Sequence, residues 1–170
     1  MPRLLDPVNY PMDRFANYQL SEASVNSKGA RSCKLESNGS QVIFNVGDIH
    51  APTFSPFGAT SYGDDVSPRQ TIEFKLNDEQ QKHWEAFDTW AITYVYANCE
   101  RLFKKSLAQD QLRESYRSPV TRKEGYQPQL RCKMNTSGPK VARAWRGQER
   151  IELPNNLRMV PIIPRITISG

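Results

Sequence analysis

A chain of 170 residues is long enough for one ordinary domain with its own core and too short for two comfortable ones. It is also too short for a polymerase, which needs more than a palm domain. The formal net charge of +5 is unevenly distributed: residues 1–100 hold 8 Lys/Arg and 13 Asp/Glu, and residues 101–150 hold 13 Lys/Arg and 4 Asp/Glu. A basic third next to a mildly acidic body favours a nucleic-acid surface, and a solvated basic face is the plainer alternative.

The cysteine and histidine content argues against a metal site. Cys33, Cys99 and Cys132 are odd in number and widely spaced, and the only histidines are His50 and His83. This pattern offers no zinc-type ligand set and predicts free, buried thiols in a reducing compartment. The sequence shows no signal-peptide core and no long apolar run. We therefore expect an intracellular protein, cytoplasmic or nuclear, with no membrane partner, no metal and no other cofactor.

The first part of the chain predicts an arm followed by a hairpin. Residues 1–30 are expected to form an N-terminal arm, because the first twenty carry three prolines and no clear period. Residues 31–36 and 41–46 have strand character, and Asn38-Gly39 between them suits a type I′ turn. The prolines and glycines of residues 51–68 then exclude regular structure.

A strand and a long helix come next. Residues 69–76 alternate between apolar and polar side chains, as a half-buried strand does. Asn77 predicts the start of a helix over about residues 77–107, because Asn77 can cap the first turn and Gln80 can complete a capping box. An apolar stripe at helical spacing continues to about Leu107. The polar segment after it predicts a mobile surface loop.

The remainder of the chain returns to strands. Strand character is found in four segments: "YQPQLRCKM", "KVARAWRG", "RIEL" and "MVPIIPRITI". The order of elements predicts a mainly β fold with one long inserted helix. We expect an OB-like, partly open antiparallel β-barrel over residues 31–170.

Two short patterns suggest metal chemistry. Gly63-Asp64-Asp65 is similar to the metal-binding turn of RNA polymerase palms, but small turn-forming residues surround it and Asx-turn chemistry explains it without a metal. Asp65, Glu73 and Lys75 have the local order of a Mg²⁺-dependent nuclease, in which carboxylates hold the metal and the lysine steadies the attacking water. The short gap between Asp65 and Glu73 counts against this interpretation. Glu and Lys are also typical of the solvent face of a non-catalytic strand.

A third pattern interleaves aromatic and basic residues. Unpaired bases stack on aromatic rings for roughly 1–3 kcal/mol each while Lys and Arg follow the phosphates, so this combination suits single-strand binding. The candidate nucleic-acid-binding residues are Phe54, Phe57, Tyr62, Lys104, Lys105, Arg122, Lys123, Tyr126, Arg131, Lys133, Lys140, Arg143, Trp145 and Arg146. Some aromatic rings belong to the core instead, and we expect this of Phe74, Trp84 and Phe87. Phe57 and Trp145 suit either role, whereas Phe54 and Tyr62 favour exposure.

Two of these segments resemble the single-stranded-DNA-binding proteins of nucleocytoplasmic large DNA viruses. They are "DIHAPTFSPFGATSYGDDVSPRQTIEFKL", a Pro-Phe-Gly loop before a strand and helix, and "GYQPQLRCKMNTSG", a Tyr-x-Pro before a strand of alternating basic and apolar residues. The element order is also similar to the single-stranded-DNA-binding protein of short-tailed phages, an OB-fold with an inserted helix. The resemblance covers about residues 31–170. It implies a non-enzymatic protein that coats single strands in DNA replication, recombination or repair, and it points to Phe57, Gly58, Tyr62, Tyr126, Pro128, Arg131 and Lys133.

The sequence therefore predicts non-sequence-specific binding of single-stranded DNA, with RNA as the alternative polymer. We also expect that the protein could act in a viral replication compartment of an infected cell. Its further expected partners are replication proteins and a second copy of the chain. Two alternatives stay open: the Mg²⁺-dependent nuclease, and a structural or assembly protein with a basic nucleic-acid-contacting face. The chain ends at "PRITISG", where the resemblance leads us to expect one more aromatic-bearing strand, and it has no acidic tail of the kind that recruits partners in phage and bacterial relatives.

Overall fold

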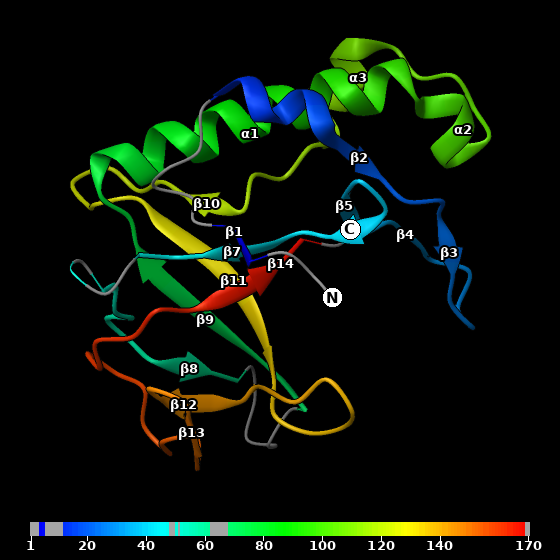
Figure 1. The fold of residues 1–170 in the computed structure, drawn as a ribbon. Helices are drawn as coiled ribbons and strands as arrows, with labels where there is room; N and C mark the ends of the chain where they lie inside the picture. Colours follow the sequence, from blue (N-terminus) through cyan, green and yellow to red (C-terminus); the bar gives the residue numbers. More distant parts are fainter. Residues whose placement is uncertain (1–3, 6–11, 48–49, 51, 62–67, 169–170) are drawn as a thin grey trace. The chain divides into compact units, whose positions relative to one another are not determined.

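The computed structural model describes residues 4–5, 12–47, 50, 52–61 and 68–168 (Figure 1). Their regular structure is mostly strands in several small sheets, joined by a few helices, and no sheet formed by these residues closes into a barrel. The predicted β-rich class is confirmed at this level. The chain divides into two compact units: unit 1 is Met1–Ala51, Asn77–Ser118 and Ile163–Gly170, and unit 2 is Pro52–Leu76 and Pro119–Ile162.

The strands of unit 1 form small sheets of two or three strands. The sheets are β1 (Leu4–Leu5), β7 (Ile43–Asn45) and β14 (Arg165–Thr167); β2 (Tyr18–Leu20), β5 (Leu35–Ser37) and β6 (Ser40–Gln41); and β3 (Ser24–Val25) with β4 (Arg31–Ser32). Only β1 and β7 pair in parallel among these strands. Asn38 and Gly39 have φ angles of 51° and 73° between β5 and β6. The predicted hairpin turn is therefore confirmed, because a type I′ turn needs positive φ at both central residues.

The predicted long helix is divided into two. α1 (Asp78–Ala97) begins as expected at Asn77, whose side chain accepts from the Gln80 amide while Gln80 accepts from the Asn77 amide, each over 2.9 Å. It ends at Asn98, where both the backbone N–H and the side-chain amide donate to the Tyr94 carbonyl. α2 (Cys99–Phe103) then restarts the helix, and Lys104 closes it in the left-handed conformation. No helix in the described part of the chain has the length and apolar character needed to cross a bilayer.

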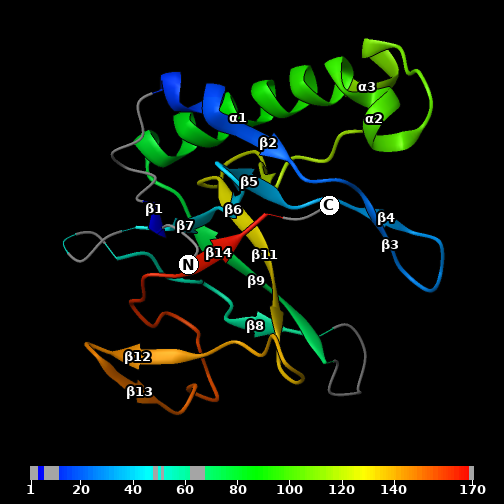
Figure 2. The same ribbon diagram turned by 45° about the vertical axis from the view of Figure 1, so that its right-hand side comes forward.

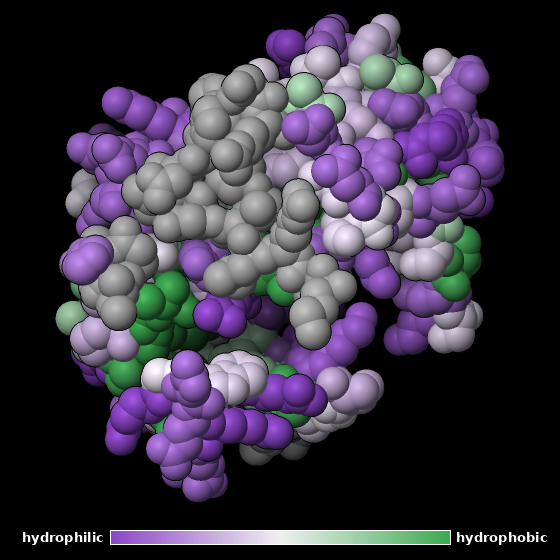
Figure 3. All heavy atoms as spheres, viewed as in Figure 1, coloured by the Kyte–Doolittle hydropathy of each residue, from purple (hydrophilic) through white to green (hydrophobic). Residues whose placement is uncertain are grey.

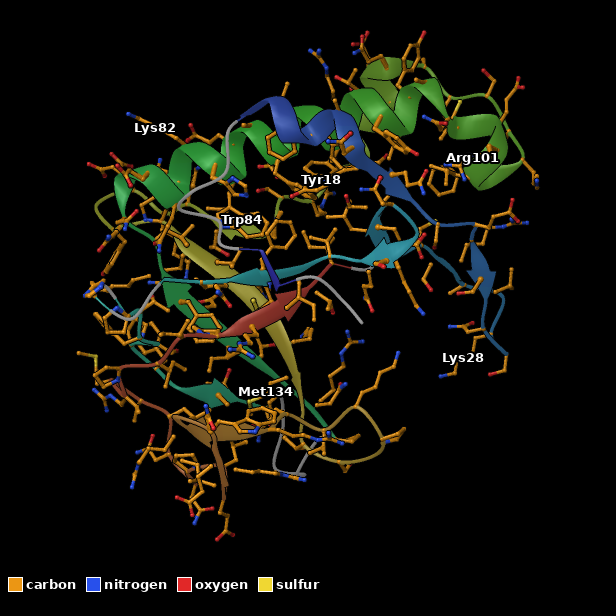
Figure 4. All side chains as sticks on the ribbon, viewed as in Figure 1. Tyr18, Lys28, Lys82, Trp84, Arg101 and Met134 are labelled. Carbon is orange, nitrogen blue, oxygen red and sulfur yellow. The ribbon has the colours of Figure 1, made fainter. Side chains whose placement is uncertain are left out.

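A cluster of aromatic rings forms the core of unit 1. Trp84 (labelled in Figure 4) and Phe87 are buried on α1, as predicted. The ring centroid of Trp84 lies 5.5 Å from that of Phe44 on β7. The 3-10 helix η2 (Met12–Asn17) runs alongside α1 in both ribbon views (Figure 2). Its Phe15, together with Tyr18 of β2, is buried in the same cluster. Part of the segment predicted as an arm is thus packed, because these two aromatic side chains find apolar partners there.

Unit 2 contains one four-stranded antiparallel sheet and one hairpin. The sheet order is β10 (Val120–Thr121), β11 (Gln129–Asn135), β9 (Arg69–Lys75) and β8 (Ala59–Thr60), and the hairpin pairs β12 (Ala144–Arg146) with β13 (Glu149–Ile151). Ile72, Phe74 and Leu130 are buried on one face of the sheet. The other face of the same strands is polar, and it forms part of the candidate site.

Candidate nucleic-acid interface

The two units differ sharply in charge. Unit 2 holds eleven Lys/Arg and six Asp/Glu, whereas unit 1 holds twelve of each. The whole net charge of +5 therefore belongs to unit 2. Because phosphate groups are attracted by net positive potential, unit 2 is the part of the chain suited to a polyanion.

Four cationic side chains share the polar face of the central strand pair of unit 2. β9 and β11 pair with Lys75 opposite Gln129, Glu73 opposite Arg131, Thr71 opposite Lys133 and Arg69 opposite Asn135. Residues directly opposite, and residues two apart along a strand, lie on one face. Arg69, Lys75, Arg131 and Lys133 therefore form what we call the basic ladder. Glu73 is the one carboxylate among the paired residues of this face.

Side-chain contacts position two members of the basic ladder. Lys133 Nζ donates to Oγ1 of the buried Thr71 over 2.6 Å. Lys75 Nζ lies 5.2 Å from the centroid of the Phe54 ring, within the range of a cation–π contact. Phe54 is held beside β9, because the Lys75 backbone N–H donates to its carbonyl. The ring predicted to be exposed is half-buried.

Three other predicted rings of unit 2 are exposed. The exposed fraction is 66% for Phe57, 73% for Tyr126 and 53% for Trp145. Among the described aromatic residues, Tyr96 of unit 1 is the further large exposed ring, at 46%. All three of these predicted rings are therefore open to solvent within unit 2.

Tyr126 lies in a basic turn that is tied to β9. Its N–H donates to the Lys123 carbonyl over 3.1 Å, and Gly125 takes a φ of 77°. The Pro128 carbonyl then accepts from the Leu76 N–H over 3.1 Å, which anchors the end of the turn. Arg122 and Lys123 are exposed on the same turn.

Trp145 lies on the β12–β13 hairpin, directly opposite Arg150. An open groove of about 390 Å³ adjoins the hairpin and is lined by Ala142, Arg143, Ala144, Arg150, Ile151, Glu152 and Leu153. Figure 3 shows hydrophilic side chains projecting around β12 and β13, at the bottom of the view. Trp145 therefore presents a flat ring beside cationic side chains, an arrangement suited to an unpaired base with its phosphate.

The remaining predicted residues fall into three groups. Lys140, Arg143 and Arg146 are exposed in unit 2. Lys104 and Lys105 are exposed in unit 1, after α2, so they do not belong to unit 2 with its net positive charge. Tyr62 lies outside the described residues.

Three cations of unit 2 that were not predicted as site residues lie beside the predicted ones. Arg69 joins the basic ladder, Arg150 lies opposite Trp145, and Arg158 is exposed beside the Phe57 turn. The alternation of β9 and β11 was the signal available for Arg69. For Arg150 the signal was the strand character on both sides of Gly147, which forms a local hairpin. Arg158 had no comparable signal, because its pairing with Ser55 joins distant segments.

The nuclease pattern is only partly described. Glu73 and Lys75 lie two residues apart on one face of β9, and Asp64 and Asp65 lie outside the described residues. No group of three or more His, Cys, Asp or Glu suited to a metal ion occurs among the residues described. Cys33, Cys99 and Cys132 are free thiols, as predicted, although Cys132 is only half-buried. Desolvation by burial raises the pKa of the Cys132 thiol to about 12, so this thiol is a poor nucleophile at neutral pH.

Comparisons with known proteins add no assignment. No family model matches the chain, and no curated protein or solved structure matches it either. The resemblance to viral single-stranded-DNA-binding proteins thus stays a prediction.

Proposed function

We propose that this protein binds single-stranded DNA without strong sequence preference, in DNA replication, recombination or repair. Unpaired bases stack on the exposed rings of unit 2, and its Lys and Arg side chains neutralise phosphates. One observation carries the proposal: unit 2 holds the entire net charge together with the exposed rings Phe57, Tyr126 and Trp145. Stacking platforms combined with a cationic surface are what single-strand binding requires.

An OB-like, partly open barrel is the finer fold assignment that accompanies this function. Its support within unit 2 is an antiparallel sheet with one apolar face and one cationic face. The proposed role is non-enzymatic. The nuclease alternative has weaker support. Glu73 lies opposite Arg131, and the cations of the basic ladder around it attract anions and repel a metal cation.

The test is the salt dependence of binding to a labelled oligo(dT) strand, with an RNA strand and a DNA duplex of equal length measured beside it. Each phosphate neutralised on a single strand contributes about −0.7 to the slope of log K against log salt. We expect a steep negative slope and tighter binding of the single strand than of the duplex. A flat salt response, or equal affinity for the single strand and the duplex, contradicts the proposal.

A further inference from the structure

The turn that carries Phe57 is built around a fully buried serine. Ser55 Oγ accepts from the Gly58 N–H over 3.1 Å and donates to the Gly58 carbonyl over 3.4 Å. The Ser55 carbonyl accepts from the Met159 N–H over 2.8 Å, and Ser55 forms a parallel bridge with Arg158. The turn is thus closed on itself and fixed to a segment a hundred residues further along the chain.

Gly58 allows these two segments to come together. Its φ is +71°, and a Cβ at this position would lie 3.0 Å from the Arg158 backbone nitrogen. A side chain would therefore be strained by the backbone conformation and would also press against Arg158. The close approach holds the turn that carries Phe57 against the backbone of Arg158 and Met159.

The side chains that leave these backbones are exposed. Phe57 is 66% exposed and Met159 is 56% exposed, and Arg158, which directly precedes Met159, is also exposed. Met159 also has a φ of 59°, which costs free energy for a residue other than glycine, and Asn156 Oδ1 accepts from the Arg158 N–H over 2.8 Å to hold the local turn. The fixed and partly strained backbone thus displays an apolar ring, an apolar thioether and a cation. This combination suits a ligand that has both a flat apolar face and an anionic group.

We propose that Phe57, Arg158 and Met159 form a site for one unpaired nucleotide, and that this site gives the protein its preference for single strands over duplex. The base lies on the Phe57 ring with Met159 at its edge, and the phosphate binds the Arg158 guanidinium. This inference rests on the proposed function and assigns strand selectivity to one site within it.

The basic ladder and the exposed rings differ in whether they can distinguish a single strand from a duplex. Phosphates are present on single strands and duplexes alike, so the basic ladder attracts both. The faces of paired bases are covered by their neighbours in the stack, so an aromatic ring on the protein surface reaches them only when they are unpaired. Selectivity for single strands must therefore come from the rings, and Phe57 lies in a turn that is fixed by the Ser55 hydrogen bonds and by the close approach of Gly58 to Arg158.

The experiment compares the affinities for oligo(dT) and for a duplex of equal length in full-length variants. Phe57→Leu keeps an apolar side chain and removes the ring. We expect it to lower affinity for the single strand about tenfold and to leave affinity for the duplex unchanged, since loss of a base–ring contact is worth about one such factor or more. Lys133→Gln is the matched control and is expected to lower both affinities by a similar factor. Thermal unfolding of each variant checks that the fold is retained.

A double-variant cycle tests whether one nucleotide touches both side chains. If it does, Phe57→Leu combined with Arg158→Gln loses less affinity than the product of the two single losses. Phe57→Leu combined with Lys140→Gln is the control, and its losses are expected to multiply. The site is overturned if Phe57→Leu lowers both affinities equally or neither, or if the Phe57 and Arg158 losses simply multiply. Wild-type protein that binds no oligonucleotide would instead overturn the proposed function itself.

Discussion

Lys133 on β11 donates a 2.6 Å hydrogen bond to the buried hydroxyl of Thr71, its directly opposite neighbour on β9. A hydroxyl does not neutralise an ammonium group, so this contact orients the positive charge without cancelling it. The charge stands beside Arg131 on an exposed sheet face. This geometry makes Lys133 the most direct test of the basic ladder.

Lys133→Gln is expected to weaken binding of single-stranded DNA. Loss of one phosphate contact should also make the slope of log K against log salt shallower by about 0.7. Lys82→Gln is the control, because Lys82 is exposed on α1 of unit 1, which has no net charge (Figure 4). A salt titration of oligo(dT) affinity measures both variants. Equal slopes for wild type and Lys133→Gln would remove the basic ladder from the binding surface.

Trp145→Ala is expected to lower oligo(dT) affinity by about 1–3 kcal/mol, the usual worth of one stacked base. The side chain is already exposed, so its removal should change the free energy of unfolding little. Tyr96→Ala removes an exposed ring from unit 1 and is the matched control. Fluorescence anisotropy compares the two variants, and equal losses would show that the rings of unit 2 have no special role.

Glu73→Gln separates binding from nuclease chemistry. Removal of the one carboxylate on the paired face of β9 and β11 should raise affinity for single strands, because less negative potential opposes the phosphates. The measurement is oligo(dT) affinity, with incubation of the same strand in Mg²⁺ followed by gel analysis. A Mg²⁺-dependent cleavage that wild type performs and Glu73→Gln lacks would favour the nuclease instead.

Burial of His83 is expected to make the folded state of unit 1 less stable at acid pH. Its ring is buried and stacked on Phe15, and desolvation lowers its pKa from 6.5 to about 4. The unfolded chain then binds a proton at a pH where the folded protein does not, so stability is present above about pH 6.5 and is lost as the pH falls toward 4. The loss attributable to this group is at most about 3 kcal/mol.

Urea unfolding at a series of pH values measures this effect. His83→Phe keeps a ring among the aromatic neighbours and should flatten the decline of stability between pH 6.5 and 4. An identical decline in wild type and His83→Phe would show that other groups cause it.

The hydroxyl groups that donate to Asp88 are expected to stabilise the folded state of unit 1. Tyr116 donates to Asp88 Oδ1 over 2.8 Å and Ser118 donates to Oδ2 over 2.6 Å, which ties the end of α3 (Gln109–Ser115) to α1. Tyr116→Phe should lower the free energy of unfolding by about 1.5–3 kcal/mol, as expected for a hydrogen bond to a charged group. Tyr96→Phe removes an exposed hydroxyl and should have little effect in the same urea titration. Oligo(dT) affinity should be unchanged by both substitutions.

Local signals predicted the local structure well. The turn at Asn38-Gly39, the strand at Arg69–Lys75 and the helix start at Asn77 each depend on residues within a few positions of one another, and the structure shows all three. The same is true of the alternation in β11, which placed Arg131 and Lys133 on one face. The burial of Trp84 and Phe87 followed from helical spacing.

The features that the sequence did not predict depend on distant partners. α3 lies in a segment predicted as a loop, and its tether to Asp88 spans about thirty residues. Phe54 was expected to be exposed, but its ring is half-buried beside Lys75, twenty-one positions later. The pairing of Ser55 with Arg158 has no sequence signal at all, since neither residue carries a turn or strand pattern that specifies the other.

The boundaries of the two units have a consequence for how the chain can be divided. The chain leaves one unit for the other at four places, after Ala51, Leu76, Ser118 and Ile162. No single cut therefore yields one complete unit and one complete remainder, and a premature stop after residue 118 removes most of unit 2 along with the last strand of unit 1, β14. The cationic surface of unit 2 and the aromatic core of unit 1 are therefore encoded by interleaved segments, and neither can be expressed alone as one continuous piece of the chain.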